Sequence, residues 1–530
     1  MRGQSDAGPK WIFYEPAANH QLAAGHPHTS PEYRTSLAET PETCPLQLFS
    51  PAAAMARPGT GSTTKTEDIP LATSTETFDL EKLKRVPQLT SVQQWPKRKK
   101  WINLMLISIQ GTLSPVCSTF LAVGAYQVDL DLNVSSPAVA ALPVALFVLG
   151  LGLGPLYLAP LSEMFGRKIV YVVSFGLFSL FNVGCALVKD ETGLIILRLL
   201  AGLAGSAGPS LGAGSIGDMF TREQRGGAQA IYGFGPTFGP ALGGIVGGYI
   251  AERAGWRWLM WTMAIASGIT TILSILFLQE TYVPYLNARA QGSRFAPTTV
   301  GFGASLTRPI RMFFTAPIVT TMSMYMALIY GVLYLHFVTI PLLFGPSPLF
   351  GLFTYGWKNG NEGLAYLGAG VGCYVATIFC LFTLNRSYRA LERRYGGHKP
   401  EFRMLFMQIG MLFVPIGLFI YGWAAQFQKH WAIPLLGAGI FAFGMLLAYV
   451  CIQTYLTDSF AQFAASALAA TIVLRSVFGA IFSIVGAKLY ERLGYGWGTS
   501  LLAFISVAAL PIPTLFWFYG PKLRAKKFVA

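Results

Sequence analysis

The chain is short of charge, and it lacks the sequence that binds nucleotide phosphates. Only 12% of its 530 residues are Asp, Glu, Lys or Arg, whereas 53% are hydrophobic. A water-soluble protein carries about twice that share of charged residues, so lipid must cover much of this surface. No Gly-Lys dipeptide occurs, which excludes the phosphate-binding loop that ATP-driven pumps use.

Cysteine and histidine are few and scattered along the chain. Of the six cysteines, Cys44 lies in a polar stretch and the others lie in apolar segments, with no paired spacing that indicates a disulfide framework or a zinc site. The six histidines are equally dispersed. A membrane-embedded enzyme would gather His or acidic residues at one membrane face, so we predict a protein that is not an enzyme and binds no metal or cofactor.

Apolar runs of about twenty residues dominate the chain after the basic tract at 97–100. A helix of that length crosses a hydrocarbon core of about 30 Å. Proline and glycine inside such runs are tolerated, because neighbouring helices satisfy the freed backbone groups. We predict twelve spanning helices, at 101–124, 136–158, 169–188, 194–216, 227–250, 257–278, 317–340, 363–383, 404–423, 431–456, 464–488 and 498–519.

The basic residues distinguish the two sides of the membrane. A net charge of +15 would indicate a nucleic-acid partner in a soluble protein, but here Lys and Arg gather in the alternate loops that share a side with both termini. This bias is typical of cytoplasmic loops. We therefore predict a multi-pass plasma-membrane protein with cytoplasmic termini and no nucleic-acid partner. Asn133, in an Asn-x-Ser motif of an outer loop, is a candidate glycosylation site.

The predicted spans divide into two sets of six. Asp218 and Asp458 end the fourth and tenth helices in similar sequences, which indicates an internal repeat. Two such halves with a binding site between them form a recurring transporter architecture. Met55 offers a second start besides Met1, and the sequence leaves both open. The predicted domains are a disordered cytoplasmic tail at 1–96, a six-helix bundle at 97–285, a cytoplasmic loop at 286–316, a second six-helix bundle at 317–519 and a cytoplasmic tail at 520–530.

The strongest local pattern is the turn between the second and third helices, APLSEMFGRK at 159–168. Glu163 and Arg167 are four residues apart, so they would pair if this stretch is helical. Gly166 permits a sharp reversal of the chain. Arg167 and Lys168 then lie at the inner membrane surface.

Two more patterns follow in the fourth and fifth helices. Arg198 stands about four residues into an apolar helix, where it either faces a central cavity or extends to the outer surface. The fifth helix contains GPTFGPALGG at 235–244, with Gly235, Gly239 and Gly243 at a four-residue spacing that allows close helix approach. Pro240, which directly follows Gly239, bends the helix, and Gly244 ends the pattern.

These patterns resemble the major facilitator superfamily, and over about 95–530 the chain looks like its fungal twelve-helix drug:proton antiporters. The resemblance implies an all-α polytopic membrane protein with two pseudo-symmetric six-helix bundles. It implies a charge relay that stabilises the outward-open state, formed by Glu163, Gly166, Arg167, Lys168 and Asp218, although Met164 replaces a basic residue of the family pattern. It also implies that the helix-five pattern, Gly235 to Gly244, is an antiporter motif.

The function expected from this resemblance is export of small organic molecules by alternating access. The substrate would be a lipophilic drug, toxin or fungal secondary metabolite, carried by a monomer in contact with membrane lipid. The proton gradient would drive transport without any bound cofactor. Uptake of a nutrient or a polyamine on the same fold remains the alternative. The helix-five motif favours export, and a polyamine carrier should place acids in its cavity.

The coupling residue is not evident, because no Asp or Glu lies deep in any predicted span. Glu163, Asp218, Glu280 and Asp458 lie near cytoplasmic ends, so one of these titrates, His336 carries the proton, or transport is passive. Polar and aromatic side chains in apolar surroundings are candidates for the substrate cavity. Each could equally hydrogen-bond between helices. The candidates are Gln110, Arg198, Tyr325, Tyr330, Gln453 and Arg475.

Overall fold

The computed structural model describes 92–134, 136–293, 295, 302–346, 352–358, 360–397, 399–460 and 463–525. Most of the predicted tail at 1–96 lies outside these residues, as do the last five residues of the predicted tail at 520–530. The described residues form helices joined by short connections, and no strand occurs among them.

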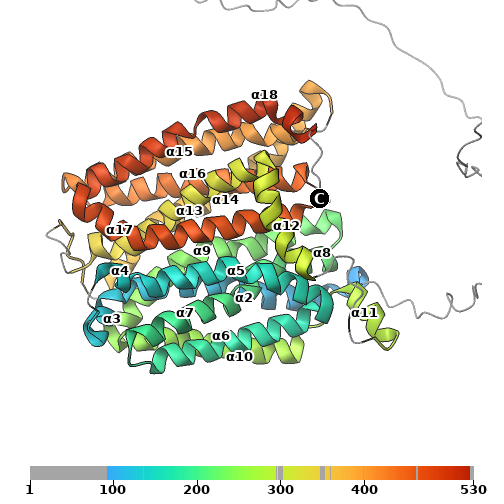
Figure 1. Cartoon of the computed structure of the whole chain (residues 1–530), viewed down its shortest axis with the longest axis horizontal. Coiled ribbons are helices and arrows are strands. Elements are labelled where there is room, and N and C mark those ends of the chain that lie inside the picture. Colours follow the sequence, from blue (N-terminus) through green and yellow to red (C-terminus); the bar gives the residue numbers. More distant parts are fainter. Residues whose placement is uncertain are drawn as a thin grey trace, which may run out of the picture. The chain divides into compact units, whose positions relative to one another are not determined.

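The first six spans form an amino-terminal bundle (Figure 1). Its first span follows the short turn η1 (Val92–Gln94), and its fourth span consists of two consecutive helices. Short helices α3 (Ala125–Leu132) and α4 (Pro137–Ala140) connect the first span to the second. The spans are α2 (Lys97–Val123), α5 (Leu142–Phe165), α6 (Arg167–Leu187), α7 (Glu191–Gly205) with α8 (Ala207–Met219), α9 (Arg222–Ala254) and α10 (Trp256–Phe277).

A second bundle follows two connecting helices, α11 (Val283–Ala290) and α12 (Phe302–Thr315). Short turns η2 (Asn361–Ala365) and η3 (Pro400–Arg403) precede its second and third spans. The helices of this carboxy-terminal bundle are α13 (Pro317–Phe344), α14 (Tyr366–Tyr395), α15 (Met404–Gln426), α16 (Ala432–Ser459), α17 (Ala464–Ala508) and α18 (Pro511–Ala525). Within α17 the backbone leaves helical geometry at Gly494, with a φ of 70° that glycine adopts without strain. The eleventh span therefore ends there, and the remainder of α17 together with α18 makes the twelfth.

The described residues confirm the prediction of twelve spans. Length and hydropathy alone select ten stretches. The last of these, Ala464–Arg524, contains two spans, and α9 is long enough to cross although it is rich in glycine and polar residues. Most predicted ranges differ from the observed helices by a few residues at their ends, and two end well short of them. The second helix is α5 and ends at Phe165, where Gly166 has a φ of 89°, and the eighth is α14 and continues to Tyr395, before Gly396 with a φ of 66°.

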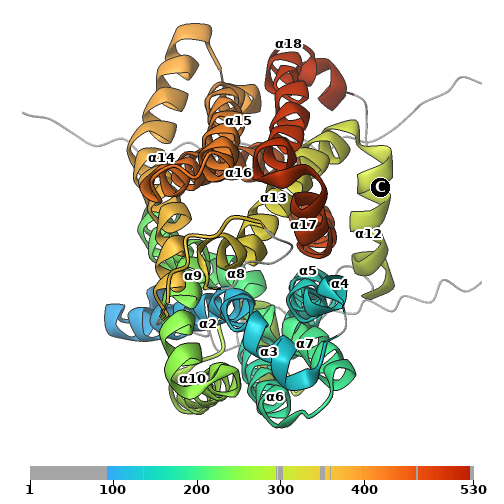
Figure 2. The ribbon, with the colours of Figure 1, turned by 90° about the vertical axis from the view of Figure 1, so that its left-hand side faces the viewer.

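The two bundles lie against each other along α5 with α17 and along α9 with α14 (Figure 2). The start of α2 and the end of α18 lie at one end of the helices, which we call the termini-side end; α3, α4 and η2 lie at the far end (Figure 1). Tyr249 donates to Asn361 Oδ1 at 3.0 Å and Tyr334 donates to Ser118 Oγ at 3.2 Å. Both hydrogen bonds join the bundles in the far half of the helices.

Candidate functional site

A cavity of about 160 Å³ lies between the bundles. Its volume is below the range of about 300–1,000 Å³ common for ligand pockets, so the site is narrow in this conformation. Helices of both bundles supply its walls, and Arg475 is the one charged residue among them. The lining residues are Pro115, Leu151, Pro155, Pro209, Ser210, Pro236, Thr237, Pro240, Tyr330, Leu333, Tyr334, Phe337, Cys373, Met445, Leu446, Tyr449, Ile472, Arg475 and Ser476.

Arg475 enters the cavity from α17 between two tyrosine rings. Its guanidinium carbon lies 4.7 Å from the ring centre of Tyr330 and 5.3 Å from that of Tyr449. Its Nε is buried without a hydrogen-bond partner, and no carboxylate pairs with it among the described residues. Cation–π contacts contribute roughly 0.5–2 kcal/mol, whereas burying an ion costs several kcal/mol. The two rings therefore compensate only part of that cost.

The glycines of the helix-five motif face two different neighbours. A Cβ at Gly235, Gly239 or Gly243 would contact α2, and at Gly243 it would overlap the Val116 carbonyl oxygen. Thr119 Oγ1 on α2 also donates to the carbonyl oxygen of Pro240 at 2.8 Å. This face therefore holds α9 against α2, as the four-residue glycine spacing predicted.

The other face of α9 meets the second bundle at the far end. A Cβ on Gly244 would overlap the ring of Tyr366, and one on Gly248 would meet the carbonyl oxygen of Gly360. Across the same contact, Gly363 approaches the carbonyl oxygen of Gly244. Side chains larger than hydrogen cannot occupy these positions unless the bundles separate, so the glycines permit a tight closure at the far end.

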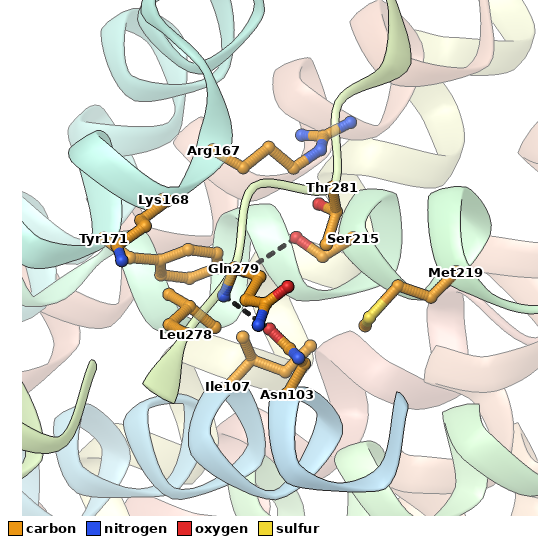
Figure 3. Close-up of a pocket in the computed structure, with 10 residues that line it drawn as sticks. All are labelled: Asn103, Ile107, Arg167, Lys168, Tyr171, Ser215, Met219, Leu278, Gln279 and Thr281. Atoms are coloured by element: carbon orange, nitrogen blue, oxygen red, sulfur yellow. Dashed lines mark hydrogen bonds between the residues drawn. The ribbon is translucent and has the colours of Figure 1, made fainter. Parts of the chain in front are cut away.

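A charge cluster occupies the termini-side end of the first bundle, and Figure 3 shows two of its residues, Arg167 and Lys168, beside the pocket that they help to line. Arg167 Nε lies 2.6 Å from Asp218 Oδ2, and both side chains are mostly buried. Glu280, just after α10, accepts the backbone N–H groups of Arg167 and Lys168 at 2.9 and 3.0 Å, which are free donors at the start of α6. Glu163 is exposed and makes no hydrogen bond or ion pair among the described residues, since Gly166 interrupts the helix before Arg167.

The second bundle has a looser counterpart at the same end. Arg403 Nε lies 3.5 Å from Asp458 Oδ2, and its Nη1 is buried without a partner. Beside this pair, Glu401 is nearly fully buried and accepts two hydrogen bonds from Arg524, at 2.9 and 3.0 Å. Both clusters join helices of a single bundle, so neither bridges the two halves.

The structure places Arg198 outside the cavity. It is fully buried inside the amino-terminal bundle, where it donates to the carbonyl oxygens of Pro143 at 3.3 Å and Cys117 at 3.1 Å. Its Nη1 also lies 3.1 Å from the Cys117 sulfur, and its guanidinium lies 4.0 Å from the ring centre of Phe147. The sequence left two alternatives, a central cavity or the outer surface, and the observed position is a third.

The remaining predicted cavity residues divide in a similar way. Tyr330 and Arg475 line the cavity, whereas Gln110 donates to Ser274 inside the first bundle at 2.9 Å. Tyr325 is buried in the second bundle. Gln453 lies one helical turn from Tyr449 toward the termini-side end of α16. His336 points away from the cavity and stacks on Phe441 with ring centres 5.1 Å apart.

Asn133, the candidate glycosylation site, lies exposed at the far end. It ends α3 with a φ of 51°, a left-handed conformation that asparagine tolerates better than most residues. Nearby, hydrogen bonds from Trp256 and Arg257 hold the pKa of Asp131 below its ordinary value. These contacts fix the end of α3 against α10.

Comparisons with known proteins agree with this architecture. The family model of the Major Facilitator Superfamily matches residues 102–484. The chain belongs to the Major Facilitator Superfamily. It is 40% identical to the MFS-type transporter penM of Penicillium rubens over 445 residues, 81% of this chain and 86% of that protein. It is 37% identical to the efflux pump radE of Floropilus chiversii over 451 residues, 82% of each chain.

Solved structures of the superfamily show the same fold. The partially occluded inward-open xylose transporter XylE from E. coli matches with a TM-score of 0.60 and 15% identity, over 79% of this chain and 97% of that one. At that identity the likeness concerns the fold alone. The family match and the fungal relatives show that this chain is a membrane transporter of small molecules and not an enzyme.

The sequence missed several residues that line the cavity of this superfamily member. Tyr334, Phe337 and Tyr449 line it together with Tyr330 and Arg475. Tyr330, Tyr334 and Phe337 lie three or four residues apart on one face of α13, a spacing visible in the sequence. Because α13 is apolar on all sides, that spacing did not stand out from ordinary packing residues.

Proposed function

We propose that this chain exports small, lipophilic organic molecules across the plasma membrane by alternating access, as a monomer with cytoplasmic termini. The observation that carries the proposal is the cavity between the bundles, lined by proline, aromatic and aliphatic side chains from both. Such a surface suits a planar apolar compound and offers few groups to a sugar or another polar nutrient. No Asp or Glu lines it, which disfavours a polyamine.

Alternating access needs a closure at one end that can open. The far-end contact between α9 and η2 consists mainly of glycine backbone, with the hydrogen bond from Tyr249 to Asn361 beside it. Few side chains would have to be displaced when the bundles separate there. We propose that this conformation faces the cytoplasm and that release to the outside follows separation at the far end.

The driving force is proposed to be proton exchange. This part of the proposal rests on the resemblance to drug:proton antiporters, and the candidate proton carriers are acids at the termini-side end, Asp218, Asp458 and the exposed Glu163. If protons drive export, an uncoupler should abolish it at unchanged expression. Export that survives the uncoupler would remove the proton from the mechanism.

The direction of transport is tested by deleting the gene and then restoring it. Cells without the protein should accumulate more of at least one planar lipophilic toxin and resist it less. Restoring the wild-type chain should reverse both changes, whereas Gly244→Val should not, because its side chain would overlap Tyr366. Gly233→Val serves as the matched control on the same helix, since a Cβ there meets nothing within 4 Å. Growth that fails for want of a nutrient, with lower uptake of it, would establish the uptake alternative instead.

A further inference from the structure

Arg475 is buried beside the cavity with no carboxylate partner among the described residues, and its Nε has no hydrogen-bond acceptor, whereas the equally buried Arg198 bonds two carbonyl oxygens and a sulfur. Arg167, Arg257, Arg403 and Arg524 each pair with a carboxylate. A charge kept in the membrane without a counterion is costly, and such residues mark the path of a substrate or an ion. The counterion of Arg475 is therefore expected to be an anionic ligand that binds reversibly.

The cavity around Arg475 restricts what that anion can be. Tyr330 and Tyr449 lie beside the guanidinium, and the rest of the lining offers only a few hydroxyl groups, such as those of Ser210 and Ser476. A small inorganic anion would lose its hydration shell in such a cavity and gain few hydrogen bonds in return. A planar molecule with one acidic group would instead place its ring system among the aromatic side chains.

The guanidinium fits an oxyanion better than it fits a neutral dipole. Its planar fork presents parallel N–H groups that match a carboxylate or an ionised enol or phenol, and charge-assisted hydrogen bonds are the stronger kind. The Nε atom, buried without a partner, is one donor already free for such a bond. No lining carboxylate competes for it.

We propose that the cavity binds planar organic acids in their anionic form, with the acidic group against Arg475 and the ring system beside Tyr330 and Tyr449. This inference rests on the proposed function in taking the cavity as the transport site, and it names the class of substrate. An anion that leaves a cell with a negative interior moves down the electrical gradient, so the membrane potential favours its export.

The test compares two dyes that share a xanthene core and differ in charge. Fluorescein is an anion above neutral pH, and rhodamine 6G is a cation. Fluorescence anisotropy would measure the binding of each to the purified full-length protein in nanodiscs of phosphatidylcholine, with empty nanodiscs subtracted. Wild-type protein should bind fluorescein at least roughly tenfold more tightly than rhodamine 6G, the scale of one charge-assisted hydrogen bond.

Three variants locate the effect. Arg475→Gln should weaken fluorescein binding roughly 10- to 100-fold and leave rhodamine 6G binding the same or tighter. Arg475→Lys should retain part of the fluorescein affinity, because it keeps the charge without the planar fork. Arg253→Gln, which removes an exposed arginine at the end of α9, should change neither dye.

The inference is overturned if the wild type prefers rhodamine 6G, if no saturable fluorescein binding occurs, or if Arg475→Gln binds fluorescein as wild type does. Monodisperse elution of each variant establishes that it is folded before binding is measured. Binding in nanodiscs does not depend on the direction of transport. A protein that prefers the anion but imports would therefore refute export alone.

Discussion

Arg198 in the amino-terminal bundle and Arg475 in the carboxy-terminal bundle are both arginines within membrane-spanning helices, yet their surroundings differ. Arg198 is fully enclosed, with two carbonyl oxygens and a sulfur as hydrogen-bond acceptors. Arg475 faces the cavity between Tyr330 and Tyr449, and its Nε has no hydrogen-bond partner. The first arginine connects α2, α5 and α7, and the second lines the cavity with one nitrogen unpartnered.

The same contrast recurs at the termini-side end. The pair of Arg167 and Asp218 is short, at 2.6 Å, whereas the pair of Arg403 and Asp458 is 3.5 Å long and leaves an Arg403 nitrogen unpartnered. Of these two related pairs, the one in the amino-terminal bundle is the tighter. We infer that this bundle acts as the more rigid half, against which the second bundle rearranges.

The largest effect expected from this contrast is on folding. Arg198→Ala removes three hydrogen bonds and leaves a cavity beside Phe147, so it should destabilise the protein by roughly 2–4 kcal/mol. The yield of monodisperse protein and its unfolding temperature should both fall. Arg253→Ala is the control, and equal stability of the two variants would break the comparison.

A second test concerns the packing of α9 on α2 in the same bundle. Gly243→Val should lower the free energy of unfolding by about 1–3 kcal/mol. Its side chain would overlap the backbone of Val116. Gly233→Val, open on its surface, should cost little. Unfolding temperatures in one detergent measure both, and an unaffected Gly243→Val protein would mean that this bundle is less rigid than we infer.

The two charge pairs should differ in a smaller, functional way. Asp218→Asn removes a short, mostly buried pair and should lower transport strongly while the protein still reaches the membrane, because the charges bias a conformational equilibrium. Asp458→Asn should have a weaker effect, because its pair with Arg403 is similarly buried but longer, at 3.5 Å against 2.6 Å. Efflux per surface molecule decides between them. Equal losses would show that the two ends work as a symmetric pair.

The smallest expected effect concerns Asp129, a carboxyl of the amino-terminal bundle with one oxygen that is buried and unpartnered. Burial, and to a lesser degree the charge of Glu191, raises the pKa of Asp129 at the far end to about 6. Folding therefore favours the protonated carboxyl, so stability should decline as the pH rises from about 4 through about 6. Because the group is only half-buried, we expect about 1 kcal/mol. The melting temperature of Asp129→Asn should lack this pH dependence, and an identical profile would contradict the assignment.

The sequence predicted the spans well because hydropathy reports which residues lipid surrounds. It did worse at helix ends such as Phe165 and Tyr395, where the helix continues beyond the apolar run until a glycine with positive φ. The pair of Arg167 and Asp218, implied by the family resemblance, occurs in the structure at 2.6 Å. The expected pairing of Glu163 with Arg167 does not occur, because Gly166 separates their helices.

The cavity itself was harder to predict. Arg198 and Arg475 look alike in sequence, each a single cation in an apolar helix, and only tertiary packing separates a satisfied arginine from an open one. Periodicity could not resolve them, since helices buried in a membrane bundle are apolar on every face. Tyr449 was missed for the same reason, because an aromatic residue in an apolar helix indicates packing as readily as binding.

The most direct test measures fluorescein efflux per folded molecule for Arg475→Gln and Arg198→Gln in the same cells. Size-exclusion fluorescence of a tagged chain counts the folded molecules, and efflux from preloaded cells gives transport. We predict that Arg475→Gln folds in normal amount and exports almost no dye. Arg198→Gln should fold poorly, while each folded molecule exports at close to the wild-type rate. The opposite pattern, with normal efflux from Arg475→Gln and inactive but well-folded Arg198→Gln, would contradict the account.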